Sequence, residues 1–242
     1  MCGKVKVRLW AGSQVAGSPT AIILRNFVSH AESDRFADWS AHYEAMGALA
    51  DVRGDGSDLM SPFFARVGGR TVCGARGRHV FVEEMGRFCF VAESYGGAPA
   101  VPAPPGLWPL QERVKALLAN VVAEDPFKGA FINVVRPGGS VAEHMDSRVM
   151  HQGGTCSVVR CNIIVQMGQG GAPVIGDDAL GLSAGDGWMF MASEVRHRSQ
   201  EVSGGKSRII VSMGFLVKPE AEVVVREEEP GGMEVVCIQG SG

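Results

Sequence analysis

The sequence lacks an apolar run that approaches the roughly 20 residues needed to cross a membrane. Its first ten residues alternate charged with apolar side chains, a composition unlike that of a secretory signal. Six cysteines are present, and none forms a Cys-x-x-Cys pair. We therefore expect reduced thiols in an intracellular protein, cytoplasmic or nuclear, that has no membrane partner.

An excess of charge of one sign is also lacking, because 23 Lys and Arg residues face 26 Asp and Glu residues. The net charge of −3 argues against a protein whose whole surface binds nucleic acid, but it permits a local basic patch. The chain has 242 residues, 45% of them apolar, and no internal repeat. These features predict a single globular domain over residues 1–242.

Glycine is abundant, with 33 residues, and it separates many short apolar or alternating segments. This pattern predicts a mostly β fold with flanking helices and a sandwich or jelly-roll core. Apolar residues at helical spacing predict helices over residues 33–50 and 107–122. Strands are expected over 4–10, 20–25, 70–73, 79–82, 88–91, 130–135, 141–145, 157–166, 173–175, 180–183, 188–191, 196–201 and 207–217.

The expected elements divide the domain into three regions. Residues 1–106 would form an N-terminal α/β covering region that recognises the substrate, and residues 107–217 would form a helix plus the jelly-roll core. Residues 218–242 would form a C-terminal tail, although 233–239 have the composition of either one last strand or a loose end.

Two histidines and one aspartate are candidate metal ligands. Residues two apart on a strand point to one face, so His144 and Asp146 can bind one ion, together with the more distant His197. Such a set can bind one face of Fe(II) and leave the opposite face open to a 2-oxo acid and dioxygen. Arg208 could bind the far carboxylate of 2-oxoglutarate through its planar guanidinium. The alternatives are a zinc hydrolase site, which needs no such arginine, and histidines with purely structural roles.

A glycine turn gives a first geometric test of this site. If a hairpin turn is centred on Gly138-Gly139, Asn133 faces His144 across two antiparallel strands. Asn133 would then lie beside the metal and could donate a hydrogen bond to a ligand carboxylate.

A second turn, at Gly204-Gly205, gives a similar prediction. In that register His197 faces Ser212, and His197 and Arg208 project from the same face of one sheet. Their offset of four strand positions, roughly 13 Å, would leave room for a metal-bound oxo acid.

Three segments resemble the AlkB family of Fe(II)/2-oxoglutarate dioxygenases: residues 103–110 (APPGLWPL), 131–146 (FINVVRPGGSVAEHMD) and 197–215. The Pro-Gly-Gly turn and the distance between the distal histidine and arginine are most similar to the branch that demethylates N6-methyladenosine in RNA. The resemblance implies a double-stranded β-helix (jelly-roll) core. It implies that His144, Asp146 and His197 are catalytic iron ligands, and that Arg208 and Asn133 bind 2-oxoglutarate.

The resemblance further implies oxidative demethylation of N-methylated nucleic acid, single-stranded RNA before DNA, with dioxygen as co-substrate. Hydroxylation of an N-methyl carbon gives a product that collapses to the free amine and formaldehyde. Two positions depart from the family pattern, since Val135 replaces a tyrosine and Gly214 replaces a second arginine. Arg160 and Lys206 are candidates for replacing the missing cation.

The substrate is less well determined by the sequence. The segment 63–90 has a local excess of arginine beside phenylalanine, a composition suited to single-stranded nucleic acid but also to an ordinary solvated surface. No individual substrate-binding residue and no oligomeric state follows from it. Two other functions remain: a 2-oxoglutarate-dependent hydroxylase of a protein side chain or small molecule, and a degenerate, non-catalytic module that binds RNA or a partner.

Overall fold

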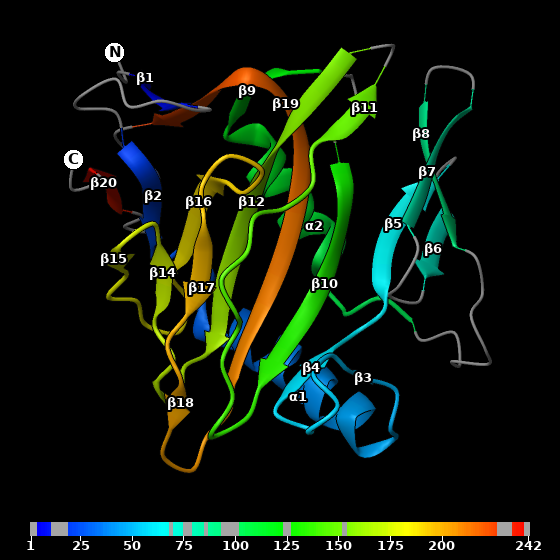
Figure 1. The fold of residues 1–242 in the computed structure, drawn as a ribbon, viewed down its shortest axis with the longest axis vertical. Helices are drawn as coiled ribbons and strands as arrows, with labels where there is room; N and C mark the ends of the chain where they lie inside the picture. The colour runs from blue at the N-terminus through cyan, green and yellow to red at the C-terminus, as the bar shows by residue number, and fades with distance from the viewer. Residues whose placement is uncertain are drawn as a thin grey trace.

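The computed structural model describes residues 4–10, 19–67, 70–74, 79–84, 87–92, 102–122, 127–151, 154–226 and 234–239. Within these ranges the fold centres on one large antiparallel sheet, the major sheet (Figure 1). Its main path is β20 (Glu234–Gln239), β2 (Pro19–Arg25), β16 (Gly187–Met191), β12 (Gly154–Gln166), β19 (Arg208–Arg226), β10 (Phe127–Val135), β4 (Asp58–Met60) and β3 (Ala50–Asp51).

Further strands extend the major sheet at its margins. β1 (Lys4–Trp10) and β9 (Leu118–Val121) pair with β19, β11 (Val149–His151) pairs with β12, and β5 (Phe63–Val67) and β6 (Arg70–Gly74) continue from β10. Three smaller sheets are separate from it. They are β15-β14-β17 (Asp178–Ala179, Pro173–Ile175 and His197–Ser199), β13-β18 (Gln169–Gly170 and Val202–Ser203) and β7-β8 (His79–Glu84 and Arg87–Ala92).

Two helices cover one face of the major sheet, behind its long strands in Figure 1. The helix α1 (His30–Ala45) begins with a capping box between Ser29 and Glu32, which satisfies backbone N–H groups of its first turn. The helix α2 (Leu107–Ala116) follows Gly106, whose φ of +89° suits glycine. Apolar side chains of both helices pack with those of the sheet in one buried cluster, which therefore lies on the helix side.

The opposite face of the major sheet carries the polar side chains. Along β19, Ile209 and Val211 join the helix-side cluster, while Arg208, Ile210 and Ser212 line a pocket on the other side. This alternation follows from the two-residue period of a strand. The small sheet β15-β14-β17 contributes to the far wall of the same pocket, so two layers enclose it.

The predicted mostly β, jelly-roll architecture is confirmed, with several corrections to its elements. Strands were expected over residues 141–145 and 180–183, but neither segment forms a regular strand. The strand β15 ends at Ala179, just before the second of them. The second helix ends at Ala116, because the chain continues as β9 and pairs with β19. β19 itself extends to Arg226, past the expected end at Val217, because β1 pairs with its last residues. Residues 234–239 form the strand β20 on β2.

Within the described ranges, no helix has both the length and the apolar character that a membrane span requires. Three of the cysteines, Cys156, Cys161 and Cys237, are free thiols, as expected for them. Burial raises the pKa of the Cys161 thiol, so this group stays protonated.

Candidate metal centre and anion pocket

The two candidate histidines are brought together by backbone pairing. The His144 N–H donates to the His197 carbonyl at 3.0 Å, and the His197 N–H donates to the His144 carbonyl at 2.9 Å. Their rings lie 4.1 Å apart between centroids. Ligand atoms of His144, Asp146 and His197 all lie within 4.8 Å of one another, as a shared metal ion requires.

Hydrogen bonds fix the tautomer of both imidazoles. Nδ1 of His144 lies 2.9 Å from the Ala142 carbonyl, and Nδ1 of His197 lies 3.0 Å from the Val195 carbonyl. A carbonyl oxygen only accepts, so each Nδ1 carries the proton and each Nε2 presents a lone pair. Burial lowers the pKa of His197, which favours the neutral form that binds metals.

Asp146 is held from two directions. Its backbone N–H donates to the Ala192 carbonyl at 2.8 Å, and its Oδ2 accepts from Arg160 Nε at 2.6 Å. Its Oδ1 lies 3.8 Å from His144 Nε2, on the side of the histidines. The arginine therefore orients the carboxylate so that one oxygen faces the imidazoles.

Arg160 comes from the middle of β12 and is nearly buried. Its guanidinium carbon lies 5.2 Å from the centre of the Phe131 ring, a cation–π contact. Directly opposite Arg160 on β19 is Gly214, the position where the AlkB pattern has an arginine. Of the two cations considered as replacements, Arg160 lines the pocket, whereas Lys206 is exposed and does not.

A second arginine marks the other end of the pocket. Arg208 begins β19, is 2% exposed and donates through Nη1 to the Gly171 carbonyl at 2.7 Å. Its Nε is buried and has no hydrogen-bond partner among the described residues. Burial lowers the pKa of Arg208 to about 10, although the nearby Asp58 carboxylate opposes the shift. The guanidinium remains charged near neutral pH and can bind an anionic ligand.

Asn133 lies at this arginine end of the pocket. Its Nδ2 donates to Asp58 Oδ1 at 2.5 Å and to the Leu59 carbonyl at 3.1 Å, while its buried Oδ1 has no partner within the described ranges. The hairpin prediction for this residue is wrong, because β10 pairs with β19 and β4. Asn133 therefore faces Ile210 and Met60 instead of His144.

The second hairpin prediction is wrong for a related reason. β17 has only three residues and pairs with β14, so His197 faces Ile175 and not Ser212. After the Pro-Gly-Gly turn, the chain leaves the major sheet and runs along β17, where Val141 and His144 pair with Ser199 and His197. The metal ligands thus lie against the small sheet, and Arg208 lies in the major sheet.

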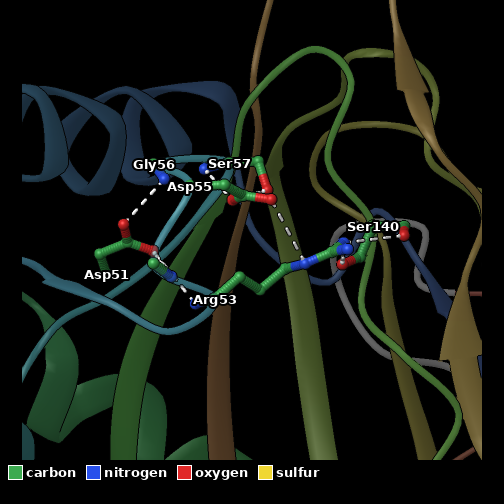
Figure 2. A network of polar contacts seen from close by, with 7 residues as sticks. Asp51, Arg53, Asp55, Gly56, Ser57 and Ser140 are labelled. Carbon is green, nitrogen blue, oxygen red and sulfur yellow. Dashed lines mark hydrogen bonds and ion pairs between the residues drawn. The ribbon is translucent and has the colours of Figure 1, made fainter.

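The loop before Asp58 is fixed to the Pro-Gly-Gly turn, as Figure 2 shows. Arg53 donates through Nη1 to the Ser140 carbonyl at 3.1 Å, and the Asp51 carboxylate accepts backbone N–H groups within its own loop. A Cβ added at Gly139 would lie 2.5 Å from the Ser57 carbonyl, so glycine permits this close approach. The loop therefore sets the position of β4 and Asp58.

These groups line one pocket with about 710 Å³ of empty space, part of it open to solvent. Its residues include the three candidate ligands at one end and Arg208 at the other. Four of its side chains have a buried polar atom with no hydrogen-bond partner in the part of the chain that the structure describes: Asn133 Oδ1, Asn162 Oδ1, Trp188 Nε1 and Arg208 Nε. Buried polar atoms are nearly always paired, so their clustering indicates a polar ligand.

Sequence reasoning did not identify Asp58, Asn162 or Trp188 as residues of the site. For Asn162 a signal was present, because it alternates with Arg160 on β12 and must share its face. Asp58 had no such signal, since it belongs to a three-residue strand in an irregular region. In the arginine-rich segment 63–90, Arg76 and Arg78 lie outside the described residues, and the structure describes only the backbone at Arg66, Arg70 and Arg87.

The donor set fits a divalent metal of the Fe(II) type, because two neutral imidazoles and one carboxylate on one side leave other positions open. The unpartnered guanidinium nitrogen fits a carboxylate at the opposite end.

No family model and no curated protein matches the sequence. Solved structures do match the fold. A viral collagen prolyl hydroxylase from Paramecium bursaria Chlorella virus-1, in complex with 2-oxoglutarate, has a TM-score of 0.54 and 10% identity over 84% of this chain and 99% of its own. HygX from Streptomyces hygroscopicus, with nickel and 2-oxoglutarate bound, has a TM-score of 0.52 and 10% identity over 82% of this chain and 83% of its own. The chain has the jelly-roll fold of these 2-oxoglutarate-binding proteins.

Proposed function

We propose that the protein is an Fe(II)/2-oxoglutarate-dependent dioxygenase. The observation that carries this proposal is a single pocket with His144, Asp146 and His197 at one end and the buried guanidinium of Arg208 at the other, whose Nε has no hydrogen-bond partner among the described residues. Bound Fe(II) would supply the activation of dioxygen, coupled to oxidation of 2-oxoglutarate to succinate and carbon dioxide.

The protein's own residues would bind and orient the reactants. The two Nε2 lone pairs and one Asp146 oxygen would hold the metal, and Arg160 would keep the carboxylate turned toward it. Arg208 would bind the far carboxylate of 2-oxoglutarate, with Asn133 beside it. Buried apolar residues between the two ends, such as Ile210, would exclude water from the bound oxo acid.

For the substrate, two chemical classes are supported by different observations. The AlkB-like segments 103–110, 131–146 and 197–215 favour oxidative demethylation of N-methylated nucleic acid, single-stranded RNA first. The likeness to a structure named as a collagen prolyl hydroxylase favours hydroxylation of a protein side chain or small molecule. Val135 and Gly214, which depart from the AlkB pattern, also favour the second class.

One experiment tests the activity and separates the classes. Purified protein is loaded anaerobically with Fe(II) and 2-oxoglutarate, exposed to air, and assayed for succinate and formaldehyde with and without methylated single-stranded RNA. RNA-dependent succinate with formaldehyde supports demethylation, and RNA-independent succinate without formaldehyde supports a hydroxylase. Absence of both iron retention and turnover would contradict the enzyme and favour a non-catalytic module.

The matched variants are His144→Ala and His30→Ala, since His30 is an exposed residue at the start of α1. His144→Ala should reduce turnover by more than the roughly 10- to 100-fold that loss of a residue supporting a ligand costs. His30→Ala should retain the wild-type rate. Full activity in His144→Ala would show that the metal binds elsewhere.

A further inference from the structure

Two of the unpartnered polar atoms belong to neighbouring strands. Trp188 on β16 pairs with Asn162 on β12, which in turn pairs with Ser212 on β19. Trp188 is 3% exposed and Asn162 is 7% exposed, and both line the pocket. Trp188 Nε1 and Asn162 Oδ1 have no hydrogen-bond partner among the described residues.

An indole N–H can only donate, so Trp188 needs an acceptor. Trp39 shows the usual arrangement in this protein, since its Nε1 donates to the Pro102 carbonyl at 3.2 Å. A phenylalanine at position 188 would fill most of this space without leaving a polar atom unpaired. The unsatisfied indole therefore indicates that the pocket's ligand presents an acceptor at this place.

The register of the major sheet shows which end of the pocket Trp188 and Asn162 occupy. Phe190 lies two residues from Trp188 on β16, and Arg160 lies two residues from Asn162 on β12. Both contact candidate metal ligands: the centre of the Phe190 ring is 4.7 Å from that of the His197 ring, and Arg160 donates to Asp146. In the other direction, Arg208 lies four residues from Ser212 on β19, roughly 13 Å along the strand. Trp188 is thus close to the metal end and distant from Arg208.

We propose that Trp188 and Asn162 bind the metal-chelating, 2-oxo acid end of the co-substrate, with the indole N–H donating to an oxygen of its carboxylate or oxo group. Asn162 supplies a second polar contact, because its amide can present either an oxygen or an NH₂ group. This inference rests on the proposed function. The two ends of 2-oxoglutarate are then bound by different residues: Trp188 and Asn162 bind the oxo acid, and Arg208 binds the far carboxylate.

Two ligands separate these roles, because pyruvate has the oxo acid end of 2-oxoglutarate but no far carboxylate. Binding of each is measured by calorimetry to full-length protein loaded with Ni(II), which does not turn over. Trp188→Phe should weaken both ligands by a similar factor, about tenfold for one hydrogen bond to a charged group. Arg208→Met should weaken 2-oxoglutarate and leave pyruvate unchanged.

Trp39→Phe is the matched control, since it removes an indole N–H outside the pocket and should leave both affinities unchanged. Asn162→Leu is a second variant that tests the same end if Trp188→Phe does not fold. The inference is overturned if the folded variants bind both ligands as the wild type does, or lose affinity for 2-oxoglutarate alone. In those cases wild-type binding of 2-oxoglutarate still supports the proposed function, whereas a wild type that binds no 2-oxoglutarate contradicts both.

Discussion

At the scale of single residues, Arg160 is the side chain whose role the structure defines best. It donates to Asp146 Oδ2 at 2.6 Å and lies opposite Gly214, so its guanidinium occupies the side of the sheet that an arginine at position 214 would share. Residues that hydrogen-bond to metal ligands orient those ligands for binding the metal. Arg160 thus supplies a cation from the neighbouring strand at the place where the AlkB pattern has an arginine at position 214.

We predict that Arg160→Met lowers metal affinity by about 10- to 100-fold, the usual cost of losing a partner of a ligand. Methionine keeps the apolar volume but cannot hold the carboxylate. The measurement is a Ni(II) titration of the purified variant. Arg196→Met is the control, because Arg196 forms an exposed ion pair with Glu143 at 3.2 Å and such pairs contribute little. Equal affinities in Arg160→Met and wild type would assign the arginine a role in packing only.

At the scale of elements, the site depends on two segments that bind each other: the irregular residues 141–148, and residues 192–199, which end in the short strand β17. Backbone pairs between His144 and His197 form part of the connection. Glu194 forms another, because its buried carboxylate accepts from Arg148, Ser157 and Ser193. Burial alone would raise the pKa of Glu194, but these hydrogen bonds outweigh it and hold the pKa below the usual range.

A depressed pKa has a defined consequence for stability. The contribution of Glu194 is fully present above the ordinary glutamate pKa and is lost as pH falls through its lower folded-state value. We predict that Glu194→Gln lowers the midpoint of thermal unfolding by about 2–4 °C at pH 7. The difference from wild type should shrink in acid, below the ordinary glutamate range. Glu143→Gln, in an exposed pair, is the control, and a pH-independent difference would contradict this reasoning.

The elements also show where sequence reasoning succeeds and where it ends. The apolar or alternating segments 157–166 and 207–217 predicted strands, and the strands β12 and β19 that contain most of these residues form the centre of the sheet. Glycine turns marked where the chain reverses but not which strand becomes the neighbour. In a jelly roll, residues that pair across neighbouring strands, such as Val135 and Arg208, are distant in sequence. The strand β17 has three residues, too few to pair along the whole of the expected hairpin. Both hairpin registers were therefore wrong.

The candidate site, like the fold, was predictable in part. His144, Asp146, His197 and Arg208 carry chemistry that is visible in their residue types and spacing, and the structure places all four on one pocket. Trp188 was not predicted, because a tryptophan in an apolar strand usually packs in the core. Only the three-dimensional structure reveals that its indole nitrogen has no hydrogen-bond partner among the residues that the structure describes.

At the scale of the whole molecule, the pocket lies between the major sheet and the small sheet β15-β14-β17. His197 belongs to β17 and His144 pairs with it, while Asp146 is oriented by Arg160 from β12 of the major sheet. Arg160 and Arg208, two of the arginines that line the pocket, also come from the major sheet. A metal with a bound oxo acid would therefore bridge the layers, and its binding free energy would add to the free energy of unfolding.

We predict that Ni(II) raises the midpoint of thermal unfolding and that 2-oxoglutarate raises it further only after the metal is present. A ligand at 100 times its Kd adds about 2.7 kcal/mol, which corresponds to roughly 5–10 °C for a chain of this size. His197→Ala should lose the shift and His30→Ala should keep it. A shift that persists in His197→Ala would place the ion elsewhere, whereas 2-oxoglutarate that stabilises the metal-free protein equally would mean that Arg208, not the chelate, dominates its binding.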